Sequence, residues 1–503
     1  MMYNPVVENF TLQIESARSL MKDGQYRKAF DLIVNQDVQS LPDLLGKIEC
    51  LVDIGFVLRD EKILRYSLYL LEKHGSEVLE VADLAPRYFL NLGHQYANMV
   101  TLSSFGDEHY GFFKRVEQVK ARSFYEKVLS YDSVSDEIAF EAYKGLGQMY
   151  QSSGRGLEAL SEYQKALKLK PASREILHEK IRLMLEYSIP SLPNREEFLQ
   201  EAWALMEKSI SYREEEDDQE DVILKTRLLN CGIQRHILET PGEYPIRSVI
   251  TNSEEEHFFT KFCVTNSLYL NLCTFCRKCD FTMGDTMALS SSSLTIMQGQ
   301  KKRFVRLRDI YEQLQRKYTS GRYILSDTLN SGRHKEYLHR VFTEDDSIKT
   351  KDQSSDFFQL ASAFQTAWSL WDLAAEFISV YWDLEPSSDI HTLFYKGKEI
   401  REEWYSRTSP SLHSIFDLYS DCLVGKDKSL SVTQNILHGG SSDWNKLNTA
   451  DLKQYCILLF RQMNRVIQYL GIMHERNEYS SADWDFPRPL YNFVIIKEDI
   501  NSK

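Results

Sequence analysis

Apolar residues recur at spacings of three to four along most of this chain, a period typical of amphipathic helices. The pattern comes in pairs of short segments up to about residue 210 and in longer segments near the C-terminus. The two longest lie at 356–386, ending at Pro386, and at 452–474. The first has an apolar stripe of Phe357, Leu360, Phe364, Ala367, Trp368, Trp371 and Ala374. We therefore predict a mainly α fold that ends in a helical bundle.

Residues 140–173 carry small, aromatic and apolar residues at fixed offsets. They are Tyr143, Leu146, Gly147, Tyr150, Ala159, Tyr163, Ala166 and Pro171. The set resembles a tetratricopeptide (TPR) repeat. Gly147 and Ala159 are small where two antiparallel helices would cross, Gly154 suits a left-handed turn, and Pro171 would stop the second helix. We predict a helical hairpin here.

Weaker copies of this pattern surround the hairpin. The first has Ala17, Leu20, Gly24, Ala29 and Ile33 at corresponding offsets. Further helix pairs are predicted across 41–75, across 86–130 with an insertion at 105–113, and after 173. Because one hairpin cannot bury its own apolar face, such neighbours are required. The prediction is a TPR-like array over 1–210, and the resemblance implies that it binds a protein partner.

The rest of the chain divides by composition. An acidic linker at 211–221 contains the run REEEDDQED, which we interpret as a solvated segment. A mixed middle region, 222–345, contains cysteines and a basic helix, and a helical bundle is predicted over 346–503.

Composition and charge narrow the class of protein. The chain has 503 residues, 43% of them hydrophobic, and a formal net charge of −13. It is long enough for two or three domains, and its charge disfavours a surface that binds nucleic acid throughout. It has neither a long apolar run nor a signal-like N-terminus, so we expect a cytoplasmic protein without a membrane partner. The scattered cysteines fit reduced thiols.

The C-terminal half resembles a HEPN domain, a helical bundle common in prokaryotic toxin and antiviral-defence proteins. The segments behind this resemblance are LNLCTFCRKCDF (270–281), QRKYTSGRYILSD (315–327), AFQTAWSLWDLAAEFISVYWDL (363–384) and FRQMNRVIQYLGIMHE (460–475). The family implies a metal-independent ribonuclease with an arginine and a histidine on one helix, usually completed across a homodimer. Histidine would move the proton while arginine stabilises the phosphorane charge.

The corresponding stretch is SVTQNILHGGSSDW, where Asn435 and His438 are present but Gln434 stands in the place of the arginine. Asn435 and His438 are the first candidate catalytic residues. Arg333 and His339, in SGRHKEYLHRVF, are the second.

Two other pairs satisfy the loose arginine–histidine spacing. Arg87 and His94 lie in a predicted TPR helix, where a surface role is favoured. Arg407 and His413 are separated by Pro410, which we expect to break the helix.

Cys273, Cys276 and Cys279 form a second chemical candidate, because thiolates at this spacing can share a zinc ion. Cys263 and His257 are the nearest upstream options for a fourth ligand. The alternative is a buried helix face, since the same spacing is helical and free cysteine packs as a small hydrophobe. An iron–sulfur cluster is disfavoured by the lack of a recognisable fourth cysteine.

A local reversal of charge lies at 301–323, KKRFVRLRDIYEQLQRKYTSGRY. Its basic residues are Lys301, Lys302, Arg303, Arg306, Arg308, Arg316, Lys317 and Arg322. Such a stripe suits phosphate backbones, and the interleaved Tyr311, Tyr318 and Tyr323 suit base stacking. The alternative is a solvated helix that pairs with acidic groups.

These features together predict a TPR–HEPN protein of antiviral-defence or toxin type, whose repeats recognise a partner and whose bundle binds or cleaves RNA. The alternative is a non-catalytic scaffold or sensor with a degenerate bundle. The sequence has no Walker loop, GxGxxG, GxSxG or HExxH motif, which disfavours the common ATPases, dehydrogenases, hydrolases and zinc proteases.

Overall fold

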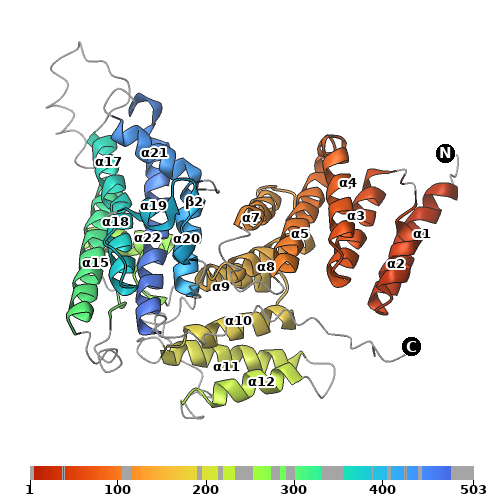
Figure 1. The fold of residues 1–503 in the computed structure, drawn as a ribbon, viewed down its shortest axis with the longest axis horizontal. Coiled ribbons are helices and arrows are strands. Elements are labelled where there is room, and N and C mark those ends of the chain that lie inside the picture. The colour runs from red at the N-terminus through yellow and green to blue at the C-terminus, as the bar shows by residue number, and fades with distance from the viewer. Residues whose placement is uncertain are drawn as a thin grey trace. The chain divides into compact units, whose positions relative to one another are not determined.

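A computed structural model shows a chain of helices joined by turns and loops (Figure 1). It describes residues 5–36, 38, 40–104, 115–189, 195–212, 219–232, 253–272, 284–289, 301–330, 355–387, 389–404, 409–423, 425, 427–439 and 444–476. Within these residues, strand is confined to an antiparallel pair, β1 (Tyr395–Lys396) and β2 (Glu399–Ile400). The mainly α class is confirmed.

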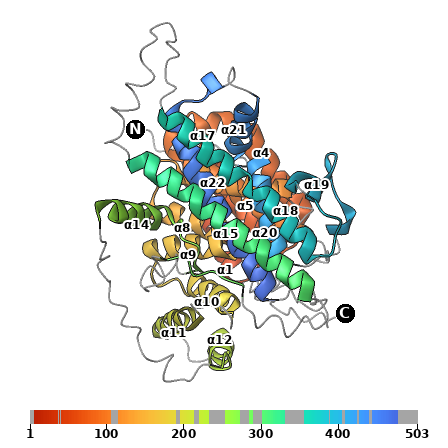
Figure 2. The ribbon, with the colours of Figure 1, turned by 90° about the vertical axis from the view of Figure 1, so that its left-hand side faces the viewer.

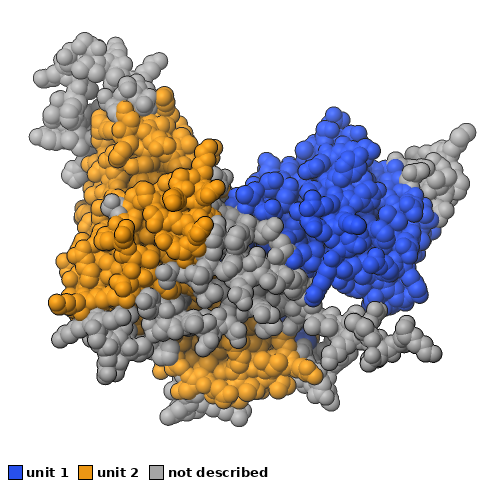
Figure 3. Space-filling view, viewed as in Figure 1, with its two compact units in different colours: residues 1–176, 485–503 blue, residues 177–484 orange. Residues whose placement is uncertain are grey.

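The described residues divide into two compact units (Figure 3). Unit 1 ends at Ile176 and unit 2 begins at Leu177, inside helix α10 (Arg174–Tyr187). The division therefore falls before residue 210, the predicted end of the array, because the helix pair after 176 makes its contacts mainly within unit 2.

Unit 1 is a series of helical hairpins. Its helices are α1 (Pro5–Lys22), α2 (Tyr26–Ile33), α3 (Leu41–Val57), α4 (Glu61–Leu79), α5 (Ala85–Ser104), α7 (Arg115–Leu129), α8 (Asp136–Ser152) and α9 (Gly156–Leu169), with a short 3-10 turn, η1 (Ala82–Leu84), before α5. Successive helices pair as α1–α2, α3–α4, α5–α7 and α8–α9. The hairpins predicted at 41–75 and 86–130 are confirmed, while the insertion at 105–113 lies outside the described residues.

The hairpin predicted at 140–173 owes its shape to small residues at the crossing. A Cβ added to Gly147 would lie 2.3 Å from the ring of Tyr163 on the facing helix, so only glycine lets α8 and α9 approach this closely. Ala159 and Ala166 are completely buried in the same hairpin. Gly154 has a φ of +79° in the turn between the helices, as predicted.

The first helices of the hairpins also contact one another in series, α1 with α3, α3 with α5 and α5 with α8. The second helices contact the next hairpin through α2–α3, α4–α5 and α7–α8. Each hairpin thus buries its apolar face against its neighbours. The first helices, as a consequence, present one face that runs along the whole of unit 1.

Unit 2 holds the remaining helices. They are the rest of α10, α11 (Arg195–Ser211), α12 (Gln219–Leu229), α14 (Glu254–Asn266), α15 (Lys301–Asn330), α17 (Ser355–Trp368), α18 (Leu370–Tyr381), α19 (Ile390–Phe394), α20 (Pro410–Leu423), α21 (Lys428–His438) and α22 (Thr449–Glu475). Two short 3-10 turns lie at η5 (Glu402–Trp404) and η6 (Trp444–Lys446).

The core of unit 2 is a bundle in which α15, α17, α18, α20 and α21 surround α22 (Figure 2). Helix α15 packs on α17, α18 and α22 through Phe304, Leu307, Tyr311, Leu314 and Tyr318, all nearly or fully buried. The predicted boundary between a middle region, 222–345, and a bundle, 346–503, is therefore misplaced. The basic helix is a bundle helix because its apolar stripe needs those neighbours.

The long helix predicted at 356–386 is two helices. Its apolar stripe is buried apart from the half-buried Trp368, but the helix stops after Trp368 and resumes at Leu370. Ser369 lies at the break, where its hydroxyl donates to the carbonyl of Thr366 at 2.7 Å. The amide of Ser369 still donates to the carbonyl of Gln365 at 3.0 Å, so the interruption is confined to this residue.

A buried polar cluster holds α12 against α10 and α11. The Nε2 atom of His178 lies 2.8 Å from both Asp221 Oδ1 and Ser209 Oγ, and its Nδ1 lies 3.2 Å from Glu220. Residues 219–221 of the predicted acidic linker are therefore the first turn of α12. Ser209 and Asp221 both contact the Nε2 atom of His178, whereas the serine and the acid of a hydrolase triad contact opposite nitrogens of the ring. The cluster therefore has a structural role.

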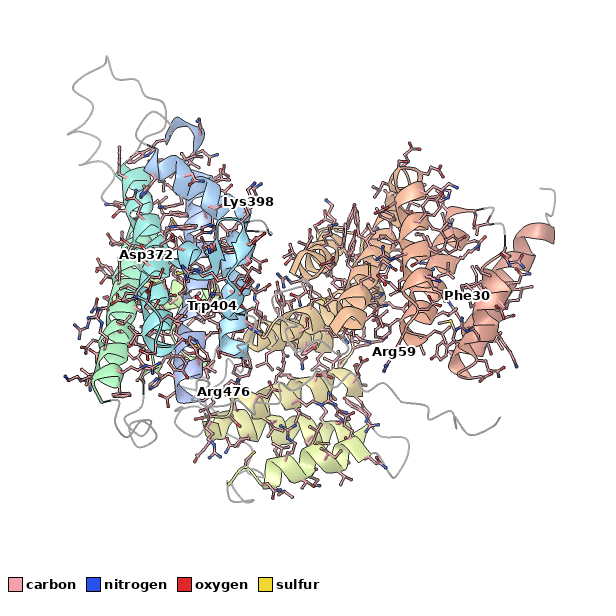
Figure 4. The ribbon with its side chains drawn as sticks, in the orientation of Figure 1. Phe30, Arg59, Asp372, Lys398, Trp404 and Arg476 are labelled. Atoms are coloured by element: carbon pink, nitrogen blue, oxygen red, sulfur yellow. The ribbon has the colours of Figure 1, made fainter. Side chains whose placement is uncertain are left out.

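The bundle and the α10–α12 segment of unit 2 are joined at Arg476, which Figure 4 labels near α10. Its guanidinium donates to the carbonyl of Glu186 and lies 4.8 Å from the ring centre of Tyr187. Elsewhere in unit 2, the indole of Trp404 is fully buried and donates to the carbonyl of Leu393 at 2.8 Å.

Candidate functional site

The face formed by the first helices of unit 1 carries a group of charged and polar side chains, which we call the shared polar face. Its members are Arg18 on α1, Glu49 and Asp53 on α3, Arg87 and His94 on α5, and Glu141 and Lys144 on α8. They come from four helices, and their charges influence one another across the helix boundaries.

Glu49 is the centre of one ion-pair cluster. Its carboxylate accepts from Arg18 at 2.8 Å and from the Nη2 of Arg87 at 2.6 Å, with a second contact from the Nε of Arg87. This bidentate pairing raises the pKa of Arg87 above its already high value. Glu49 thus satisfies two of the cations on this face.

Lys144 is the centre of a second cluster. Its ammonium lies 2.8 Å from Glu175, the second residue of α10, and 3.8 Å from Glu141. Burial lowers the pKa of Lys144, but the two carboxylates outweigh it and the net shift is upward. The third cation of the face is therefore also satisfied.

Asp53 and His94 lie between these clusters. Asp53 is exposed, and desolvation by the neighbouring protein, with smaller effects from Glu49 and Glu141, raises its pKa to about 6. Burial, with a smaller effect from Lys144, lowers the pKa of His94 to about 4. At neutral pH the face offers a poorly compensated carboxylate and a neutral imidazole.

This arrangement suits binding. Its ion pairs position side chains along an extended surface, and the neutral imidazole can donate or accept a hydrogen bond. The sequence predicts a surface role for Arg87 and His94 but does not connect them with Glu49, Asp53 or Lys144. The offset of each residue within its own hairpin would have placed these residues on one face, but the weaker repeats obscure that offset.

The structure distributes the predicted basic stripe of α15 between the surface and the interior. Lys302, Arg306, Arg308 and Arg316 are exposed, and the Nε of Arg303 donates to the carbonyl of Val380 at 2.7 Å. Of Lys301, only the backbone is described.

Most of these cations already have acidic partners. Arg306 pairs with Glu376 on α18, while Arg308 and Arg316 flank Glu312 at 3.8 and 3.0 Å. Lys317 also lowers the pKa of Asp372, labelled in Figure 4, although burial keeps that pKa above its ordinary value. The stripe is therefore partly neutralised within the protein.

Arg322 is a structural residue, and the structure removes it from the predicted nucleic-acid surface. Its side chain is 2% exposed, and it forms a bidentate pair with Asp285 at 2.6 and 2.9 Å. Tyr311 and Tyr318 are also buried, where each hydroxyl donates to a backbone carbonyl, so neither can stack on a base. Tyr323 alone of the three tyrosines is exposed.

The first catalytic candidates lie together at the end of α21. Asn435 and His438 are both exposed, and the Nδ1 of His438 lies 3.3 Å from the amide nitrogen of Gln434. The residue that replaces the expected arginine is thus the histidine's neighbour. An amide can orient an imidazole but carries no charge to stabilise a phosphorane.

The other chemical candidates lie mostly outside the described residues. These are Arg333, His339, Cys273, Cys276 and Cys279. The described ends of the cysteine segment are held together, because the side chain of Asn271 donates to the carbonyl of Gly284 at 2.7 Å.

The upstream options for a zinc ligand differ in exposure. Cys263 is fully buried, and burial raises the pKa of its thiol to about 12, which disfavours a thiolate ligand. His257 is exposed. Among the described residues, no three histidine, cysteine, aspartate or glutamate side chains converge in a metal-binding group.

The prediction that Pro410 interrupts a helix between Arg407 and His413 is confirmed, because α20 begins at Pro410. Pro410 is the first residue of α20, and the hydroxyl of Ser409 caps this helix by accepting from the amide of Leu412 at 3.1 Å. Proline at this position starts a helix. His413 is buried in the first turn, and Arg407 lies outside the described residues.

Comparisons with protein-family models, curated proteins and solved structures give no match to this chain. None of the described helices combines the length and apolar character that a membrane span requires.

Proposed function

We propose that this protein is a binding scaffold or sensor, in which the shared polar face of unit 1 recognises a segment of a partner protein. The observation that carries this proposal is the continuity of that face. Arg18, Glu49 and Arg87 come from three successive first helices and form one ion-paired cluster. Hairpins that pack in series create a long surface of this kind without needing a deep pocket.

The test is site-specific photo-crosslinking in the cells that make the protein. The photoreactive residue p-benzoylphenylalanine would replace Arg18 or Glu141, which lie on the face at partly exposed positions. Glu72, exposed on α4, provides the control position. We expect the same discrete partner at both test positions and its absence at the control.

The binding must then be reproduced with purified components. The crosslinked partner should bind the wild-type protein, and Lys144→Ala, which releases Glu141 and Glu175 from their ion pairs, should change that affinity, while Glu72→Gln should bind as wild type does. A partner that crosslinks equally well from Glu72, or an unchanged affinity in Lys144→Ala, would exclude this face as the recognition surface.

We propose, as a second function, that the bundle binds or cleaves RNA. Two observations support it. His438 and Asn435 are accessible on α21, and Lys302, Arg308 and Arg316 are accessible on α15. The antiviral or toxin-type role follows from the HEPN resemblance alone. The absence of an arginine at Gln434 favours the scaffold over the nuclease, since the phosphorane would lack its charge partner.

The nuclease proposal has a direct test. Purified protein would be incubated with total RNA and tRNA in EDTA, together with His438→Ala and, as an exposed histidine control, His257→Ala. Cleavage lost in His438→Ala and kept in His257→Ala would support the enzyme. If no RNA is cleaved even with the partner bound, the bundle is not a nuclease, and retention of RNA would have to be tested separately by filter binding.

A further inference from the structure

The charged side chains of the shared polar face differ in whether they have ion-pair partners. Arg18 and Arg87 are engaged by Glu49, and Lys144 is engaged by Glu141 and Glu175. In the described part of the chain, by contrast, Asp53 has neither an ion-pair partner nor a hydrogen-bond donor within contact distance. One carboxylate therefore remains between two completed clusters.

Asp53 is costly to the free protein in this position. Glu49 and Glu141 repel its negative charge, and Lys144 and Arg18 compensate it only in part. An aspartate at a surface position far from other carboxylates would avoid this repulsion. A carboxylate that is repelled by neighbouring carboxylates is stabilised by a cation that arrives with a ligand.

We propose that the shared polar face binds an extended, basic segment of the partner protein and that a lysine or arginine of that segment pairs with Asp53. This inference rests on the proposed function of unit 1 and specifies the chemistry of its partner. An acidic segment fits less well, because the three cations of the face already have carboxylate partners.

His94 on α5 completes the arrangement. Its imidazole is neutral at physiological pH, it is half-buried, and its ring packs edge-on against Tyr125 at 5.6 Å. A neutral imidazole can hydrogen-bond with the backbone of an extended peptide without repelling a basic side chain. The site thus combines Asp53, which selects a positive charge, with His94, which can bond to the backbone of a segment of any sequence.

Binding should depend on pH through Asp53. The charged groups that act on it are Glu49 from its own helix, Arg18 from α1, and Glu141 and Lys144 from α8. Since the pKa of Asp53 is about 6, the carboxylate is ionised at pH 7.5 and mostly protonated at pH 5. A cationic segment should bind more tightly at the higher pH and should release a proton when it binds near pH 6.

The experiment uses the full-length protein and three pools of labelled nonapeptides. Every position is randomised except the central one, which is lysine, norleucine or glutamate. We expect the lysine pool to bind about fivefold more tightly than the norleucine pool at pH 7.5, as measured by fluorescence anisotropy. The preference should disappear at pH 5.

Asp53→Asn is the decisive variant because it keeps the size of the side chain and removes its charge. It should abolish the lysine preference without lowering the melting temperature. Glu72→Gln removes an exposed carboxylate of α4 and should keep the preference. A preference that persists in Asp53→Asn, or that Glu72→Gln removes equally, would overturn the assignment.

The remaining outcomes separate this inference from the function on which it rests. If the three pools bind equally and compete with the partner crosslinked from Arg18, the face binds a partner but Asp53 does not select a basic segment. If none of the pools binds and no partner is crosslinked, both the inference and the proposed function fail.

Discussion

Arg322 illustrates how the same residue type has different roles along one helix. Its guanidinium pairs with Asp285 and also donates to the carbonyl of Leu268 at 2.7 Å, whereas Arg316 is 79% exposed on the same helix. We expect Arg322→Met to lower the free energy of unfolding by about 2–3 kcal/mol, because it leaves the carboxylate of Asp285 without its partner. Arg316→Met should change it by less than about 0.5 kcal/mol.

Urea unfolding followed by circular dichroism measures both variants. Equal effects of the two substitutions would contradict the structural role of Arg322. The sequence could not have separated these arginines, since Asp285 lies 37 residues before Arg322 and belongs to an irregular segment.

Asp53 and His94 predict opposite effects of pH on stability. The pKa of Asp53 is raised above its ordinary value. Its stabilising contribution to the free energy of unfolding is therefore present below about pH 4 and is lost as pH rises through about 6. The pKa of His94 is lowered. Its stabilising contribution to the free energy of unfolding is therefore present above about pH 6.5 and is lost as pH falls towards about 4. The two effects partly cancel in the wild-type protein.

Single substitutions should reveal each effect. Relative to wild type, Asp53→Asn should gain stability as pH rises from 4 to 6, and His94→Gln should lose it over the same range. Melting temperatures measured at half-unit pH intervals test this. Parallel curves for wild type and both variants would show that neither group changes its pKa on folding.

At the scale of the helix pair, the close crossing of α8 and α9 depends on Gly147. A methyl group there would overlap the ring of Tyr163, so we expect Gly147→Ala to lower the free energy of unfolding by about 1–3 kcal/mol. Gly284→Ala is a matched control, because a Cβ at Gly284 meets no atom within 4 Å.

The double variant Gly147→Ala/Tyr163→Ala identifies the cause. Removing the ring removes the overlap, so the two losses should not add. Strict additivity would mean that Gly147 is required for a reason other than the contact with Tyr163.

Local patterns predicted the helices well where every signal agreed. The hairpin at 140–173 and the helix at 452–474 have the expected type and nearly the expected bounds, since periodicity, glycine and proline all point the same way there. The break at Ser369 was missed because the apolar stripe continues across it. Periodicity shows which side of a helix is buried, and it carries no information about a one-residue interruption that leaves the same side buried.

At the scale of the whole molecule, the predicted divisions failed because they followed composition. The basic residues of α15 suggested a separate region, yet its buried stripe packs against α17, α18 and α22. The shared polar face was missed for a related reason. Its residues lie up to 126 positions apart, between Arg18 and Lys144, and only the packing of successive hairpins brings them to one face.

The two units give the last prediction. Each has its own buried core, with Leu45, Tyr125 and Tyr163 in unit 1 and Trp371 and Phe460 in unit 2. Because a compact unit with its own core tends to unfold cooperatively, we expect two transitions in differential scanning calorimetry.

The variants already described assign these transitions. Gly147→Ala should shift only the transition of unit 1, and Arg322→Met should shift only that of unit 2. If both substitutions move one common transition by comparable amounts, the units unfold together. A partner that binds the shared polar face would then stabilise the bundle as well, and occupancy of unit 1 could be communicated to unit 2 through stability alone.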